Sequence, residues 1–228
     1  SNADGRVIWG GDETVTKMRT YQCKPRSREI VFPDRFSFCV IKAIKIVESS
    51  DSDLKKLCEN LFNDIYIMDQ QACTSPQLFN WVGDELTIKK AKHKLWPLFS
   101  LYVNSKHSLE PIQYMKKYVD ACKNAIMNEN VKSVKHENNI LFNIELSHFH
   151  KQQQLQRGYF GTVHEASVKN LNELSLIVDD RCQTLTYFGF EVDELKNFVI
   201  SNKLRGIDRI VPIGRSLDMN VIWDGYDV

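Results

Sequence analysis

The sequence lacks any excess of charge of one sign. It carries 30 Lys and Arg against 29 Asp and Glu, a formal net charge of +1 over 228 residues. This balance gives no general attraction to nucleic acid or to anionic lipid. Long apolar runs are also missing, and the longest falls far short of the roughly 20 residues that a membrane helix needs. Because no signal peptide is visible either, we expect a soluble, cytoplasmic protein without a membrane span.

Several nucleotide and hydrolase motifs are absent as well. No Gly-x-Gly-x-x-Gly follows a strand, and no Gly-x-x-x-x-Gly-Lys-Ser/Thr occurs, so neither common phosphate-binding loop is present. The lack of Gly-x-Ser-x-Gly gives no support to a serine hydrolase. The pair Gly10-Gly11 is typical of a turn and is only a weak signal for anything else.

The cysteines lack the pairing that a disulfide or zinc framework would need. Six are present, at wide and irregular spacing and without Cys-x-x-Cys, which argues against both. Cys58 and Cys122 lie on apolar helical stripes, and we expect both to be buried in the core. His148 and His150 would lie on one face of a strand, but no third ligand has matching spacing, so we expect no metal.

What the sequence does contain is typical of a globular α/β domain, with 43% hydrophobic residues and strands that alternate with helices. The strongest helical spacing runs over residues 51–68, through Leu54, Leu57, Cys58, Leu61 and Ile65. Residues 84–130 also look helical, with an interruption at Pro97 and a new start near Pro111. The expected strands are 7–9, 29–32, 36–41, 78–82, 139–147, 159–164, 183–188 and 209–213, with short helices over 12–21 and 191–204.

Two clusters leave alternatives open. Ile112, Met115, Val119, Cys122 and Ile126 form a second apolar stripe at helical spacing. Lysines gather at 89, 90, 92 and 94, where the simpler interpretation is a solvated helix face and the sharper one is an anion site for a phosphorylated cofactor or an acidic partner.

Cys73 differs from the other five cysteines. It follows the helix over 51–68 and lies in a stretch of small and polar residues before a strand. Small neighbours leave a thiol accessible, and a turn can aim backbone N–H groups at its sulfur, which are the conditions for a nucleophile. An inert loop cysteine is the alternative from local chemistry alone.

Around Cys73 the sequence resembles a known family, the long-chain acyl-CoA reductases of bacterial bioluminescence (LuxC), which belong to the aldehyde dehydrogenase superfamily. The matching phrases, spread over nearly the whole chain in the family's order, are Gly5-Arg6-Val7-Ile8-Trp9-Gly10-Gly11-Asp12-Glu13, Phe32-Pro33-Asp34-Arg35-Phe36-Ser37, Asp69-Gln70-Gln71-Ala72-Cys73-Thr74-Ser75-Pro76-Gln77, Arg209-Ile210-Val211-Pro212-Ile213-Gly214-Arg215-Ser216-Leu217-Asp218 and Trp223-Asp224-Gly225-Tyr226.

The resemblance implies the α/β catalytic domain of the aldehyde dehydrogenase-like fold, with Cys73 as the catalytic nucleophile. Residues 1–3 look like the remnant of a cleaved tag. We expect residues 4–228 to form the cysteine-bearing domain of a longer two-domain reductase, without its nucleotide-binding domain. The superfamily's Glu-x-Phe-Gly-Pro phrase falls on residues 158–162. Phe160 would then approach the nicotinamide, while Gly158 replaces the glutamate that holds the ribose. Gln71 and Thr74, beside Cys73, are expected to contact substrate.

One departure from the superfamily is chemically informative. Oxidising members carry Glu-Leu-Gly-Gly, whose glutamate activates the deacylating water, and the matching phrase here is Ile8-Trp9-Gly10-Gly11. Ile8 would stand in place of that base. Loss of the base suits an enzyme that passes its acyl-cysteine to hydride and not to water.

The resemblance therefore predicts NADPH-dependent reduction of a long-chain fatty acyl-CoA, or an acyl-protein, to the aldehyde used in bioluminescence. NADPH would be bound mainly by the absent domain. The expected partners are the acyl-protein synthetase and acyl-transferase of the fatty acid reductase complex, with a homo-oligomer at full length. Alternatives are a superfamily reductase acting on another acyl group, and a non-enzymatic assembly domain. Phe79, Trp81 and Phe160 would line an acyl channel or pack in the core, and Cys73 is expected to alkylate first and at lower pH than the other thiols.

Overall fold

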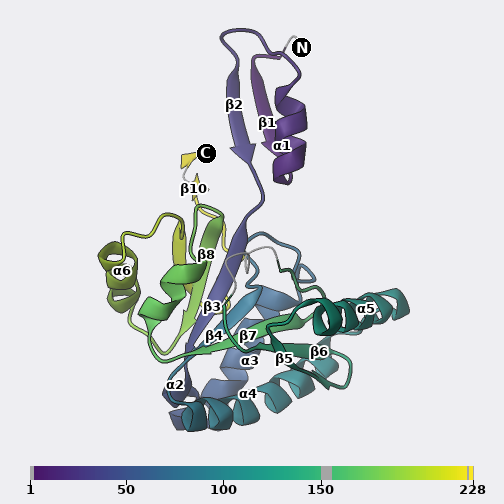
Figure 1. Ribbon diagram of the computed structural model, residues 1–228, viewed down its shortest axis with the longest axis vertical. Coiled ribbons are helices and arrows are strands. Elements are labelled where there is room, and N and C mark those ends of the chain that lie inside the picture. Colours follow the sequence, from purple (N-terminus) through teal and green to yellow (C-terminus); the bar gives the residue numbers. More distant parts are fainter. Residues whose placement is uncertain (1–2, 150–155, 225, 228) are drawn as a thin grey trace.

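A seven-stranded sheet forms the body of the molecule (Figure 1). The computed structural model describes residues 3–149, 156–224 and 226–227. The strand order is β5-β6-β7-β4-β3-β8-β9, and every neighbouring pair is parallel except β5 and β6. The strands are β3 (Phe36–Lys42), β4 (Leu78–Val82), β5 (Val131–Glu137), β6 (Leu141–Leu146), β7 (Thr162–Val168), β8 (Cys182–Phe188) and β9 (Arg209–Pro212). The predicted α/β class is confirmed.

Helices cover both faces of this sheet and give it two separate apolar layers. One layer packs α2 (Ala43–Glu48), α3 (Asp51–Ile65) and α4 (Glu85–Lys106) against the sheet. The other packs the 3-10 helix η2 (Leu171–Ile177) and α6 (Val192–Ser201) against the opposite face. The central strands β3 and β4 are buried on both faces, as their continuous apolar runs predict.

Helix α3 begins where the sequence places its start. The Ser50 hydroxyl accepts the Asp53 backbone N–H, and the Asp53 carboxylate accepts the Ser50 N–H, which completes a capping box. The predicted apolar stripe of α3 faces the sheet and is buried. The helix ends beside Tyr66, so the chain reaches Cys73 from a rigid support.

One expectation on the chain after β4 is wrong, and one strand there was not expected. Pro97 does not interrupt the helix, because α4 continues through it to Lys106. Buried side chains on both sides of the proline, among them Trp96 and Phe99, pack on the sheet and offset its cost of about 3 kcal/mol. The strand expected from residue 139 is preceded by another strand, β5, because Asn138 and Asn139 adopt positive φ and close a hairpin.

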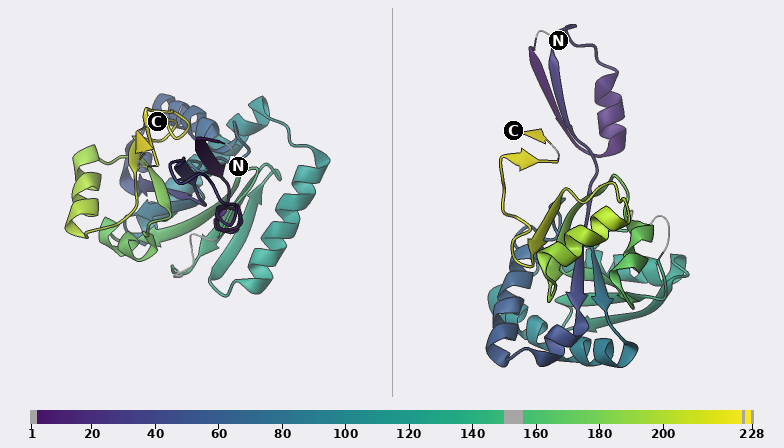
Figure 2. Two further views of the ribbon diagram at one scale, coloured as in Figure 1. Left: turned by 90° about the horizontal axis from the view of Figure 1, so that it is seen from above. Right: turned by 90° about the vertical axis from the view of Figure 1, so that its left-hand side faces the viewer.

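A small unit projects from the body at the N-terminal end (Figures 1 and 2). It consists of β1 (Gly5–Trp9), α1 (Asp12–Arg19) and β2 (Arg28–Phe32), with β1 and β2 parallel. Its own core is small, with Ile8, Val15 and Val31 as the buried residues. The C-terminal strands β10 (Ile222–Trp223) and β11 (Tyr226–Asp227) lie next to it, and the Tyr226 ring meets Phe32 with centroids 5.7 Å apart.

Candidate active site

Cys73 lies in a tight turn between α3 and β4, at the amino ends of the parallel strands. The Ser75 N–H donates to the Ala72 carbonyl at 3.0 Å and closes this turn. The Ser37 hydroxyl donates to the Cys73 carbonyl at 2.6 Å and accepts the Thr184 N–H at 3.2 Å. One serine thus ties the cysteine to the beginnings of β3 and β8.

Two glutamines hold the loop that carries Cys73. The Gln70 side chain donates to the Pro76 carbonyl at 3.1 Å, and the Gln77 side chain donates back to the Gln70 carbonyl at 2.8 Å. The Gln77 side-chain oxygen also accepts the Gly158 N–H at 2.7 Å. Both glutamines are buried, so these bonds fix the loop and join it to the segment at 158–161.

The Cys73 thiol is half-buried, and this burial raises its pKa. A hydrogen bond from the Gln183 side chain lowers that pKa again, whereas the nearby Asp224 carboxylate raises it. The backbone N–H groups of Cys73 and Thr74 also favour the thiolate. The turn therefore aims N–H groups at the sulfur, which is the arrangement that a developing oxyanion on an adjacent carbonyl would use.

A partly buried cluster of charges lies beside Cys73. The Arg35 guanidinium forms an ion pair with Asp208 and lies 3.9 Å from the Asp224 carboxylate. Only 2% of the Asp224 side chain is exposed, and it accepts a hydrogen bond from the Gln183 amide. Burial raises the pKa of Asp208 while Arg35 opposes that change. Gln183 therefore connects the thiol to the carboxylate, and Arg35 balances the charge behind it.

A second arginine approaches from the C-terminal segment. The Arg209 guanidinium stacks over Trp223 at 5.0 Å, donates to the Asp218 carbonyl at 2.7 Å, and is close enough to Cys73 for their charges to interact. The same segment is anchored to α3, because the buried Asp64 carboxylate accepts the Gly214 N–H at 2.7 Å.

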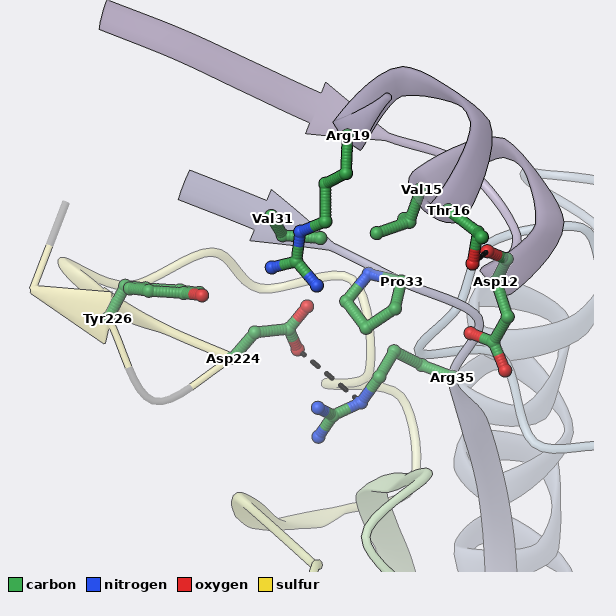
Figure 3. A pocket seen from close by; sticks show the side chains of 9 residues that line it. All are labelled: Asp12, Val15, Thr16, Arg19, Val31, Pro33, Arg35, Asp224 and Tyr226. Atoms are coloured by element: carbon green, nitrogen blue, oxygen red, sulfur yellow. Dashed lines mark hydrogen bonds and ion pairs between the residues drawn. The ribbon is translucent and has the colours of Figure 1, made fainter. Parts of the chain in front are cut away.

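A cavity of about 410 Å³ adjoins this cluster, between the projecting unit and the C-terminal strands (Figure 3). In Figure 3 the Asp224 side chain lies between Arg19, from α1, and Arg35. The residues that line the cavity are Asp12, Val15, Thr16, Arg19, Val31, Pro33, Arg35, Asp224 and Tyr226. Asp224 lines this cavity and its charge also acts on Cys73, so the cavity adjoins the site.

The segment that carries Phe160 lies next to the Cys73 loop. The Phe160 N–H donates to the Asp69 carbonyl at 3.1 Å, and the ring is only 7% exposed. A Cβ at position 158 would come within 1.8 Å of the Thr162 carbonyl oxygen. This loop therefore requires glycine at 158 and leaves no room for the glutamate that the superfamily phrase has there.

The structure brings together some of the predicted residues but not all. Cys73, Thr74 and Phe160 lie in two loops that are hydrogen-bonded to each other, although the Thr74 side chain is buried and Gln71 is exposed. Ile8 is not at the site, because it packs with Val15 and Val31 in the projecting unit. The geometry thus gives no support to Ile8 as the position of a missing base.

The acyl-channel interpretation fails for two of its three aromatic residues. Phe79 and Trp81 are fully buried in the layer beneath α4, where each ring packs edge-on against Trp96. Their role is core packing. Phe160 also packs in that layer but borders the Cys73 loop.

The lysine cluster on α4 is neither simply solvated nor a free anion site. Lys94 donates to the carbonyls of Val47 and Ser49 at 3.0 and 2.7 Å, and Lys92 lies 2.8 Å from the Glu165 carboxylate. Lys89, Lys90 and Lys92 line a groove of about 1640 Å³ that Glu145 and Glu165 also line. Lys92 and Lys94 are therefore held within the fold, whereas Lys89 and Lys90 are exposed, as the solvated-face interpretation expects.

The described part of the chain shows neither a metal-binding cluster nor a candidate membrane-spanning helix. Across residues 3–149, 156–224 and 226–227, no three His, Cys, Asp or Glu side chains gather as a metal site would require. His150, half of the predicted histidine pair, lies outside these residues. All six cysteines are free, as expected. No helix of the described residues is long and apolar enough to cross a membrane.

Five residues near the site have no role predicted from the sequence, namely Arg35, Gln183, Asp208, Arg209 and Asp224. Arg35, Arg209 and Asp224 stand within the phrases that carry the family resemblance, so that signal was available. Gln183 and Asp208 lie outside those phrases, and only the pairing of β8 with β3 brings Gln183 to the cysteine.

Comparison with solved structures shows an aldehyde dehydrogenase fold. Aldehyde dehydrogenase 21 from Physcomitrella patens matches with a TM-score of 0.61 and 12% identity, over 97% of this chain and 48% of that one. A betaine aldehyde dehydrogenase from Staphylococcus aureus, in complex with NAD+, gives 0.59 and 10%, over 92% and 44%. An NAD-dependent aldehyde dehydrogenase from Sinorhizobium meliloti gives 0.62 and 10%, over 96% and 44%.

The chain spans less than half the length of these three structures. A comparison with curated proteins gives no match. The family model described as acyl-CoA reductase (LuxC) matches residues 1–227. The chain belongs to the LuxC family of acyl-CoA reductases.

Proposed function

We propose that this chain carries the nucleophile of an acyl-CoA reductase that forms fatty aldehyde through an acyl-Cys73 thioester. The observation that supports this best is the hydrogen-bonded turn at Cys73, where the Gln183 amide and the N–H groups of Cys73 and Thr74 oppose the rise in pKa that burial causes. The substrate in this proposal is a long-chain fatty acyl-CoA, or an acyl group handed over by an acyl-protein synthetase. The aldehyde formed would be the one used in bioluminescence.

The first step is attack of the Cys73 thiolate on the thioester carbonyl carbon, which forms a new C–S bond and gives a tetrahedral oxyanion. In this proposal the Cys73 and Thr74 N–H groups, which act on the Cys73 sulfur, would stabilise that oxyanion. Its collapse breaks the bond to CoA, which leaves as a thiolate, and gives acyl-Cys73. After reduction of the acyl carbon, the Cys73 thiolate leaves and aldehyde is released, so the nucleophile is regenerated.

A nicotinamide cofactor is the reductant in this proposal, and two of the similar structures are described with NAD+ or as NAD-dependent. When bound, NADPH would supply hydride to the acyl carbon. The Phe160 loop fits this role in part: it is held against the Cys73 loop through Gln77 and Asp69. It offers no carboxylate to a ribose, since only glycine fits at 158. We propose that most contacts to NADPH come from a second domain of the reductase.

Acyl transfer to the chain tests the nucleophile. The chain is incubated with hexadecanoyl-CoA, and the adduct is located by peptide mass spectrometry. We expect one hydroxylamine-sensitive acyl group on Cys73, absent from Cys73→Ala and retained in Cys122→Ser. An acyl group that persists on Cys73→Ala would refute the assignment.

Reduction and partners are tested separately. We expect little NADPH-dependent aldehyde release from these 228 residues and full turnover from the complete reductase with its synthetase and acyl-transferase partners. Comparison of NADPH with NADH, and of hexadecanoyl-CoA with acetyl-CoA, decides cofactor and chain-length class. Robust turnover by this chain alone would contradict the proposed two-domain division.

A further inference from the structure

Helix α5 (Pro111–Met127) turns its most apolar face away from the protein. We call this face the α5 stripe and define it as Ile112, Met115, Val119, Cys122 and Ile126. Ile112, Met115 and Ile126 are 58%, 65% and 83% exposed, and Val119 is 43% exposed. α5 lies at the outer edge of the body beside β5 and β6 (Figure 1). A contiguous group of exposed apolar side chains is typical of an interaction site.

The opposite face of α5 fixes this orientation. Lys117 is 1% exposed and donates to the Asn139 and Ile140 carbonyls at the hairpin between β5 and β6. Two turns further on, the Asn124 side-chain oxygen lies 3.4 Å from the buried His164 ring. Rotating the helix to bury its stripe would break both contacts and leave buried polar groups unpaired.

The spacing of the stripe is that of a helix-pairing seam. Its five residues alternate steps of three and four, which is the a and d pattern of a heptad repeat. In the same notation Lys117 and Asn124 fall at f, the position opposite the seam. A second amphipathic helix would therefore fit against α5 with the same spacing.

We propose that the α5 stripe docks an amphipathic helix of a partner protein whose apolar seam is flanked by glutamate or aspartate. Charge complementarity selects this occupant. Lys116 and Lys123 are exposed one heptad apart along one flank of the stripe, whereas Tyr118 and Ala125 on the other flank are uncharged. Acidic residues on the partner helix would pair with these lysines and set the register.

The same charges disfavour a second copy of this chain. In antiparallel pairing, e positions face e positions, so Lys116 of one copy would meet the Lys123 of the other. In parallel pairing the lysines would face Tyr118 and Ala125, and no opposite charge would compensate them. Neither arrangement gives the complementarity that an acidic helix gives.

The test uses two synthetic peptides as long as α5, both with leucine at a and d. One carries glutamate at e and g, and the matched control carries lysine there. Binding to the protein is measured by fluorescence anisotropy of labelled peptide, and coverage of the stripe by protection of Cys122 from alkylation. We expect the acidic peptide to bind about tenfold or more tightly than the basic one, with weaker binding at high salt.

Variants test whether peptide binding depends on the α5 stripe and its flanking lysines. Lys116→Glu with Lys123→Glu should reverse the preference between the peptides. Val119→Glu should abolish binding without lowering the unfolding midpoint, because position 119 faces solvent. Leu101→Glu, at an exposed apolar position on α4, should bind as the parent protein does.

Four results would overturn the proposal. They are equal affinity for the two peptides, no binding of either, a concentration-dependent doubling of mass in which Cys122 becomes protected without peptide, and protection of Cys122 in the full-length reductase alone. The third would assign the stripe to a second copy, and the fourth to the same polypeptide. None of these results depends on acylation of Cys73.

Discussion

Helices α3 and α5 carry nearly the same spacing of apolar residues, but α3 turns them into the core and α5 turns them to solvent. On α3, residues Leu54, Leu57, Cys58, Leu61 and Ile65 are at most 3% exposed, whereas no aliphatic member of the α5 stripe is less than 43% exposed. Each stripe includes one cysteine, buried on α3 and exposed on α5. The expectation that Cys122 lies in the core is therefore wrong, while that for Cys58 is confirmed.

The difference shows what an apolar stripe does and does not determine. Spacing of three and four residues predicts a helix, and both helices form where the spacing indicates. Which face turns inward depends on what the sheet offers at that place. Beneath α5 it offers the carbonyls at 139–140 and the His164 ring, and these take Lys117 and Asn124.

Truncation of one aliphatic side chain on each helix should give the largest difference, which is a difference in the free energy of unfolding. Leu61→Ala on α3 should lower the free energy of unfolding by about 3 kcal/mol, because a large side chain in a closed layer leaves a cavity. Ile126→Ala on α5 should change it by less than about 0.5 kcal/mol, since the side chain already faces water. Urea unfolding followed by circular dichroism measures both. Similar losses in the two variants would mean that the α5 stripe is covered in solution.

The thiols of Cys58 on α3 and Cys122 on α5 should also differ strongly in their rates of alkylation. Alkylation proceeds through the thiolate, and burial raises the pKa of Cys58 to about 11 from 9.0. At pH 8 this alone lowers the thiolate fraction about a hundredfold. Exposed Cys122 should react first, and half-buried Cys73 should follow, contrary to the expectation that Cys73 leads. Time-resolved iodoacetamide labelling with peptide mass spectrometry gives the order, and early labelling of Cys58 would contradict it.

The sequence alone predicted the α/β class, α3, most strands and the family, because those depend on local spacing and on short phrases. It did not predict the continuity of α4 through Pro97, the hairpin at Asn138-Asn139 or the outward stripe of α5. The first and the third are decided by packing against residues farther away in the chain, whereas the hairpin depends on the positive φ of Asn138 and Asn139. At the site, Cys73 was found from its neighbours in the sequence, whereas Gln183 and Asp208 reach it only through the order of strands in the sheet.

Cys73 is intermediate in exposure between buried Cys58 and exposed Cys122, and its pKa depends on nearby charge as well as on burial. Asp224→Asn removes the carboxylate that raises this pKa and leaves the Arg35 charge uncompensated by it. We expect the pKa of Cys73 to fall and alkylation near pH 8 to accelerate, because the thiolate fraction rises. Gln183→Leu is the matched change in the opposite direction, since it removes the hydrogen bond that favours the thiolate. An unchanged pH profile in both variants would remove these residues from the site.

The buried face of α5 gives the smallest of these effects and tests the cause of the outward stripe. Burial lowers the pKa of Lys117 to about 7, below its ordinary value of 10.5. Between these pH values the unfolded chain binds more protons than the folded chain, so folding stability rises with pH. From pH 7 to pH 8 the parent protein should therefore gain about 1 kcal/mol relative to Lys117→Met. Urea unfolding of both proteins at the two pH values measures this difference, and Lys116→Met, at the exposed neighbouring position, should show none of it. A constant difference between the parent protein and Lys117→Met would mean that position 117 is solvated and that α5 is free to turn its stripe inward.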